Sequence, residues 1–216
     1  ANSEPINTTD LARLSTNWEN YSNEGLLSLG LAWRATVADE NGREVPEVFR
    51  RDYQAARALG LPISVHASSS RAGTGDIAAL SSAGLLGPHL QIIHAIWATP
   101  DEVQQLADSG TTVSLSPYSE LRIGYGLPST GELLAADIPV GLSVDTTALS
   151  GNADMFAIMK VIQNIGNARA NDEFGLPARK VLELATIGGA RSMGIDNLVG
   201  SLTPGKRADL IMVDTR

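Results

Sequence analysis

The chain has 216 residues, enough for one substantial hydrophobic core and few appended modules. Sixteen Lys and Arg against 24 Asp and Glu give a net charge of −8, which disfavours nucleic acid and anionic membrane surfaces as partners. Cysteine is absent, which excludes disulfides and a cysteine nucleophile, so any metal must be held by His, Asp or Glu. The apolar runs are far shorter than the roughly 20 residues of a membrane span, and we expect a cytoplasmic protein.

Five short apolar runs alternate with helical patterns along most of the chain. The segment before them, residues 1–24, is polar and weakly helical around 9–18, and it needs a neighbour to pack against. The predicted strands cover residues 25–34, 63–66, 90–94, 112–116 and 139–145, with a polar turn around 40–43. The predicted helices cover 46–59 and 76–86, begin at Thr99 and Ser129, and continue with 154–163, 177–185 and 185–193. A last apolar run lies at 208–214.

This alternation predicts an α/β fold with a parallel sheet. Strands that read as continuous apolar runs are buried on both faces, and intervening helices imply parallel pairing through right-handed crossovers. Two helix starts carry a capping-box pattern, Thr99 with Glu102 and Ser129 with Glu132. We therefore expect both serine and threonine hydroxyls to cap their helices.

Polar residues end the predicted strands, where ligands of parallel α/β folds bind. These residues are Arg34, His66, His94, Ser116 and Asp145. Two of the three histidines and one carboxylate thus occupy equivalent positions. Imidazole nitrogens and a carboxylate oxygen are suitable ligands for zinc or iron(II) when no thiolate is present. The alternative is that each histidine is an ordinary hydrogen-bonded residue of the core or surface.

Several stretches taken together resemble one known family. They are residues 91–95, 99–103, 110–117, 132–145 and 154–156, followed near the end by 185–191 and 200–214. In this order they resemble the amidohydrolase superfamily, in particular the branch with cytosine, adenosylhomocysteine and guanine deaminases and the triazine hydrolases. The resemblance covers nearly all of the chain from about Gly25 onward.

The resemblance implies a (β/α)8 TIM-type barrel with one divalent metal, zinc or iron, at the C-terminal ends of its strands. His66 would end the fifth strand as a metal ligand, and His94 would end the sixth and polarise the water or the substrate. Asp145 would end the eighth strand, bind the metal and move a proton. The implied reaction is hydrolysis of a C–N bond in a small molecule by metal-activated water.

The sequence departs from that family in two ways. The family's His-x-His pair and first barrel strands are not found, so the chain corresponds to about strands 4–8. We expect 1–24 to be a polar lead-in, 25–199 the C-terminal part of the barrel, and 200–216 the start of a β-sandwich strand. Many deaminases of this branch carry a glutamate three residues after the fifth-strand histidine, where this chain has Ser69. Serine cannot serve as an acid or base at neutral pH.

An incomplete barrel would leave one strand edge and its inner face uncovered. We expect the missing N-terminal half of the barrel or a second copy to cover them, and therefore a homo-oligomer if no such half is present. The chain alone would then lack part of its active site.

Four further residues are weaker candidates for substrate contact. Ser69 follows the fifth-strand histidine, Trp97 follows His94, and Tyr118 and Arg122 lie in the loop after residues 112–116. Trp97 either forms the floor of a substrate pocket or only covers apolar surface. The alternative for Tyr118 and Arg122 is that they belong to a solvated loop without a role in substrate contact.

Three hypotheses remain from the sequence. The first is part of a metal-dependent amidohydrolase. The second is a half-barrel scaffold or assembly fragment without catalysis. The third is a metal-independent barrel enzyme, which is disfavoured because no other pair of nucleophile and base is evident.

Overall fold

The computed structural model describes residues 5–34, 36–39 and 42–214. The strands are β1 (Leu31–Trp33), β2 (Val37–Asp39), β3 (Gly42–Glu44), β4 (Ile63–Ala67), β5 (Leu90–His94), β6 (Thr112–Leu115) and β7 (Val140–Leu142). The first helices are α1 (Thr8–Thr16), η1 (Trp18–Asn20), α2 (Glu47–Ala58), η2 (Arg71–Gly73), α3 (Asp76–Ser82), α4 (Pro100–Ser109) and α5 (Pro117–Arg122). The others are α6 (Thr130–Ala135), α7 (Thr147–Ser150), α8 (Met155–Ala170), α9 (Ala178–Glu183), η3 (Leu184–Gly188) and α10 (Gly189–Ser192).

Five strands form one parallel sheet in the order β1-β4-β5-β6-β7, which confirms the predicted α/β class. The register pairs Trp33 with Val65 and Ile92 with Val113. Each new strand adds beside the previous one, with helices in the connections, as in part of a TIM-type barrel. The short strands β2 and β3 pair antiparallel outside this sheet. Part of the turn expected at 40–43, residues 40–41, lies outside the described residues.

The two faces of the sheet differ in burial. The packed face lies under helices α2, α3, α4 and α6 and carries the core side chains Ile63, Val65, Ile92, Val113 and Leu115, each at most 1% exposed. The open face carries the alternating residues Ala32, Ser64, His66, Gln91, Ile93 and Ser114, which are exposed or half-buried. Because strand side chains alternate between faces, the strands bury one set and leave the other accessible.

The N-terminal segment packs against α2. The backbone N–H of Ile6 donates to the Asp52 carboxylate at 2.9 Å, and Leu11 packs against the core. Asn7 caps α1 by accepting hydrogen bonds from the N–H groups of Thr9 and Asp10. The expected helix around 9–18 thus forms, and it has the neighbour that its weak helical pattern requires.

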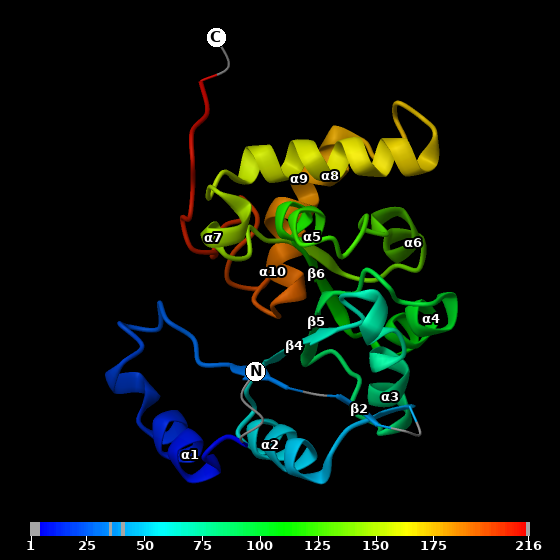
Figure 1. The fold of residues 1–216 in the computed structure, drawn as a ribbon. Helices are drawn as coiled ribbons and strands as arrows, with labels where there is room; N and C mark the ends of the chain where they lie inside the picture. The colour runs from blue at the N-terminus through cyan, green and yellow to red at the C-terminus, as the bar shows by residue number, and fades with distance from the viewer. Residues whose placement is uncertain (1–4, 35, 40–41, 215–216) are drawn as a thin grey trace.

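Figure 1 shows α1 and α2 at one end of the molecule and α8 and α9 at the other, with the main sheet between them. The C-terminal end of the chain runs away from the rest. Helices α9, η3 and α10 follow one another without a break, and η3 is a π-helical turn. None of the helices within the described ranges is long and apolar enough to cross a membrane.

Four sequence predictions need correction. The run 25–34 forms only the short strand β1, and Leu26 and Leu27 are exposed because no element covers them. The expected return strand at 208–214 does not form, since this run meets no strand to pair with, and Met212 is 98% exposed. The loop after β6 contains helix α5. Ser129 makes no capping hydrogen bond, although the Thr99 capping box is complete.

Candidate active site

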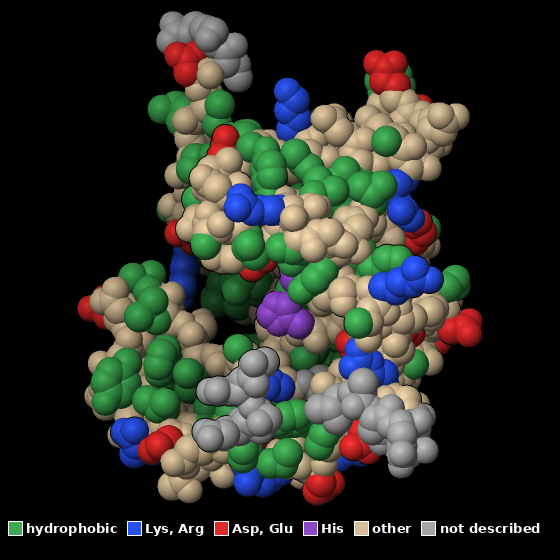
Figure 2. Space-filling model, in the orientation of Figure 1, with side chains coloured by type: hydrophobic (Ala, Val, Ile, Leu, Met, Phe, Trp, Pro, Cys, Tyr) green, Lys and Arg blue, Asp and Glu red, His purple; other side chains and the backbone are tan. Residues whose placement is uncertain are grey.

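His66 and His94 come together at the C-terminal ends of two adjacent strands. His66 is the penultimate residue of β4, and His94 is the last residue of β5. Their ring centroids are 5.3 Å apart, although His66 is exposed and His94 is only 2% exposed. Figure 2 shows histidine side chains at the margin of a hollow on this side of the molecule.

Desolvation lowers the pKa of the His66 imidazole, and the neighbouring His94 lowers it further. The charge of Asp145 acts in the opposite direction and raises this pKa. A histidine whose pKa is lowered is neutral at neutral pH, and the neutral ring is the form that can bind a metal.

Asp145 lies beyond the end of its strand rather than on it. Strand β7 ends at Leu142, so the expectation that Asp145 ends a strand is wrong by three residues. Its backbone N–H donates to the Ser143 hydroxyl at 2.9 Å, and its side chain is exposed. Of the two histidines, Asp145 acts on His66, whose pKa its charge raises.

The backbone is strained at the same ends of three strands. Ser68, His94, Ala95 and Asp145 all have positive φ, at 48°, 78°, 52° and 57°. Such conformations cost non-glycine residues of order 1 kcal/mol or more, and they collect at sites where function requires a particular geometry. A hydrogen bond of 2.7 Å from the Trp97 N–H to the Ser68 carbonyl joins the segment after β5 to the segment after β4.

Glu120 contacts His94, and the sequence alone did not predict this contact. It lies in the first turn of α5, fully buried, and its Oε1 is 3.0 Å from His94 Nδ1. The same oxygen accepts the backbone N–H of Ser116 at 2.7 Å. An acidic residue just after a predicted strand was a usable signal, but the segment had been interpreted as a loop. The Tyr125 and His94 rings pack nearly perpendicular to each other, with their centroids 5.4 Å apart.

Two of the weaker candidates lie beside these histidines in the chain and are held by backbone oxygens. The Ser69 hydroxyl donates to the Ile93 carbonyl at 3.4 Å. Trp97 is 38% exposed, and its Nε1 donates to the Tyr125 carbonyl at 2.6 Å. The Arg71 guanidinium lies 5.8 Å from the centre of the Trp97 ring. Trp97 is therefore a fixed wall beside the strand ends.

Tyr118 and Arg122 lie on α5, half-buried and exposed respectively. Within the part of the chain that the structure describes, their side chains form no hydrogen bond or ion pair. Their role in substrate contact stays a prediction.

The side chains at the strand ends are only partly suited to bind the metal that the sequence predicts here. Across residues 5–34, 36–39 and 42–214, His, Asp and Glu do not form a group of three that could hold an ion. The donor types at the strand ends still suit zinc or iron, since two imidazoles lie side by side there and a carboxylate follows the end of β7. The side chains at the strand ends are therefore of the right chemical types to bind zinc or iron, but fewer than three of them converge within the described residues.

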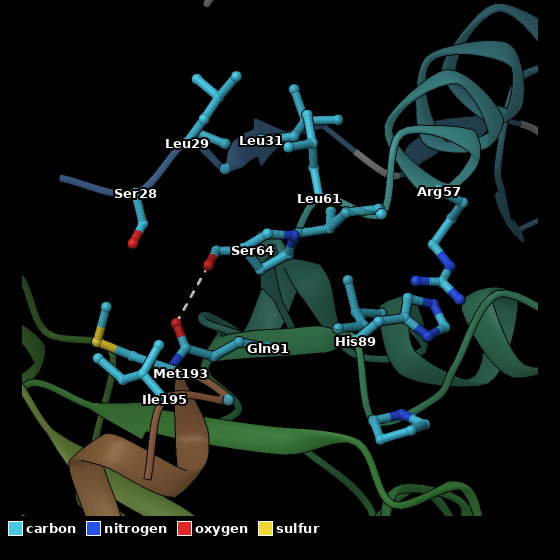
Figure 3. A pocket seen from close by; sticks show the side chains of 18 of the residues that line it. Ser28, Leu29, Leu31, Arg57, Leu61, Ser64, His89, Gln91, Met193 and Ile195 are labelled. Carbon is cyan, nitrogen blue, oxygen red and sulfur yellow. Dashed lines mark hydrogen bonds between the residues drawn. The ribbon is translucent and has the colours of Figure 1, made fainter. Parts of the chain in front are cut away.

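A separate pocket of about 570 Å³ lies at the opposite, N-terminal ends of the strands. Figure 3 shows Ser64 and Gln91 facing into it, joined by a hydrogen bond of 3.1 Å, with Met193 and Ile195 beside them. Gln91 also donates to the Ser192 carbonyl. This pocket is mainly apolar, and His66, His94 and Asp145 are not among the residues that line it, so it is not included in the candidate active site.

His89 borders the pocket at the N-terminal ends of the strands and packs against Tyr53. Its Nε2 contacts the Tyr53 hydroxyl, and the two ring centroids are 5.6 Å apart. Desolvation lowers the pKa of His89, and the Arg57 charge lowers it further.

The parallel sheet has the strand order of part of a TIM-type barrel, and the candidate site lies at its C-terminal edge, where TIM-barrel enzymes have their active sites. Residues 10–216 match the model of the amidohydrolase family, and the chain belongs to that family.

Individual relatives agree with this assignment. The 5-methylthioadenosine/S-adenosylhomocysteine deaminase of Syntrophobacter fumaroxidans is 32% identical over 180 residues, 79% of this chain and 41% of that protein. The 5'-deoxyadenosine deaminase of Methanothermobacter thermautotrophicus is 35% identical over 137 residues, 63% of this chain and 32% of that protein. The chain thus spans about two-fifths, or 41%, of the length of the first of these.

The solved structures give the same result. The crystal structure of an adenosine deaminase from Xanthomonas campestris with bound zinc has a TM-score of 0.81 and 26% identity. The match covers 92% of this chain and 46% of that one. An amidohydrolase from a Sargasso Sea environmental sample has a TM-score of 0.72 and 26% identity, covering 94% and 44%.

Proposed function

We propose that this chain is the C-terminal part of a (β/α)8 barrel that hydrolyses a C–N bond of a small molecule with one divalent metal. His66 and Asp145 would bind the metal, and His94 would orient the water or the substrate. The observation that carries the proposal is the 5.3 Å approach of the His66 and His94 rings at the C-terminal edge of the sheet.

The names of the relatives support this reaction class. Three of the four proteins compared above are called deaminases of adenosine or of its derivatives, and one of these three was crystallised with zinc. A bound divalent metal would lower the pKa of water and polarise the bond that is attacked. We accordingly propose 5'-substituted adenosines as the first substrates to test.

The chain's own residues would bind, orient and transfer protons. The neutral His66 ring would contribute a lone pair, and the exposed Asp145 carboxylate would accept a proton from the attacking water. Trp97, fixed by Tyr125, would form a wall against the planar base. Ser69 would contribute only a hydroxyl, so the proton transfers would fall to Asp145 and His94.

Metal analysis of the purified chain tests the ligand assignment. We expect about one zinc or iron per chain, and we expect His66→Ala to lose it while the free energy of unfolding changes by less than about 0.5 kcal/mol, because the side chain is exposed. His89→Ala removes a histidine from the other end of the sheet and should keep the metal. Full metal occupancy in His66→Ala would contradict the assignment.

The alternative is a half-barrel scaffold without catalysis. One observation favours it, namely that no group of three metal-binding side chains converges within the described segments. A wild-type chain that binds no metal and releases no ammonia from 5'-deoxyadenosine would support this alternative.

A further inference from the structure

We propose that Glu120 is a positioning residue that fixes the tautomer of His94. It would hold the hydrogen of the neutral ring on Nδ1 and leave Nε2 with a free lone pair. This inference rests on the proposed function for its purpose, although its geometry stands without it.

The direction of the hydrogen bond follows from the partners of one oxygen. Glu120 Oε1 accepts the backbone N–H of Ser116 at 2.7 Å, and an amide N–H can only donate. A carboxylate is an acceptor only, so Oε1 also accepts from His94 Nδ1, 3.0 Å away. The neutral His94 ring then carries its one hydrogen on Nδ1.

The burial of Glu120 makes a purely structural role costly. The residue is fully buried, and its second oxygen, Oε2, has no hydrogen-bond partner among the described residues. Burying an unpaired carboxylate oxygen destabilises a fold, whereas a serine or threonine could satisfy the Ser116 amide. Compared with such a hydroxyl, a carboxylate at this position adds the contact with His94.

The other nitrogen of His94 is available for chemistry. Nε2 forms no hydrogen bond within the described part of the chain, and it is not among the buried polar atoms that are sealed from solvent. The rings of Tyr125 and His66 pack against the His94 ring, with centroids 5.4 Å and 5.3 Å from its own. Its backbone is fixed at φ 78°. The ring can therefore present only Nε2 to an incoming molecule.

The tautomer matters because only a ring nitrogen with a lone pair can accept a hydrogen bond or a proton from water. A ring with its hydrogen on Nε2 would instead repel such a donor. A carboxylate bonded to Nδ1 is a known way to fix this choice in enzymes. Glu120 would thus act on a reaction through His94, without touching the substrate.

Nitrogen-15 NMR of the histidine rings in the metal-free chain tests the proposal at a pH where the rings are neutral. With three histidines in the chain, His94→Gln assigns the signals. We expect the Nδ1–H tautomer for His94 in the wild type and in Glu120→Gln, which retains Oε1. In Glu120→Leu we expect a shift towards Nε2–H. Asp52→Leu removes a similarly buried carboxylate from α2 and should leave His94 unchanged.

Two results would overturn the proposal. One is an Nε2–H tautomer of His94 in the wild type, a result that does not depend on whether Glu120→Leu folds. The other is an unchanged Nδ1–H tautomer in a folded Glu120→Leu chain. Neither measurement involves metal or substrate. A chain that has the Nδ1–H tautomer but binds no metal would overturn the proposed function and leave this inference intact.

Discussion

Ile92 and Ile93 are neighbours on β5, yet they belong to opposite faces of the sheet. Ile92 lies on the packed face at 0% exposure, and Ile93 lies on the open face and is half-buried. His66 lies on the same face as Ile93, with its ring against that of His94. The comparison teaches that one face carries the stability of the sheet while the other leaves side chains free for chemistry.

The largest expected effect is a difference between the two faces in how much stability the same substitution removes. Ile92→Ala should lower the free energy of unfolding by about 2–5 kcal/mol, because it removes buried methylenes and leaves a cavity. Ile93→Ala removes the same atoms from a half-buried site and should cost clearly less. Urea denaturation of both variants measures the difference. Equal losses would mean that the open face is as well packed as the other.

A smaller difference in stability loss is expected between two helix starts that share the same sequence pattern. Thr99→Ala should cost about 1 kcal/mol, since the Thr99 hydroxyl accepts the Glu102 N–H and the Glu102 carboxylate accepts the Thr99 N–H. Ser129→Ala should change stability by less than about 0.5 kcal/mol, because Ser129 makes no capping bond. A measurable loss in Ser129→Ala would show that its hydroxyl has a partner in solution.

The smallest effect concerns pH and the two ends of β5. Because the pKa of His89 is lowered in the fold, the unfolded state binds its proton more readily. The stabilising contribution is complete above the unfolded pKa of about 6.5 and is lost as the pH falls below it. Unfolding free energies measured between pH 7 and 5 should therefore fall less steeply in His89→Gln. An identical slope in that variant would mean that other groups cause the decrease.

The same acidic range tests His66, whose pKa is lowered as well. His66→Gln should also reduce the slope, because its ring is partly desolvated beside His94. Comparing the pH slopes of His66→Gln and His89→Gln shows how much the histidine at each end of the sheet contributes to the loss of stability at acidic pH. Additivity of the two changes is expected, since the histidines share no partner.

The strand order and most helices could be predicted because they depend on local patterns. Apolar runs separated by helical periods give a parallel sheet in sequence order, and the Thr99 capping box forms as expected. The apolar run at 208–214 does not form a strand, because a strand requires a partner and the pattern does not supply one. Ser129 has a capping pattern too, but its backbone does not bring the hydroxyl to the amide.

The sequence by itself determined that two histidines reach the C-terminal edge of the sheet, since periodicity places each at the end of an apolar run, although the exact end of β7 differs from the prediction. The expectation of His66 and His94 at that edge came from this periodicity. Only the tertiary structure decided that Glu120 bonds to His94, because residues 26 apart in the chain meet through the packing of α5 on the sheet. Local patterns encode elements, whereas side-chain contacts between elements depend on how those elements pack.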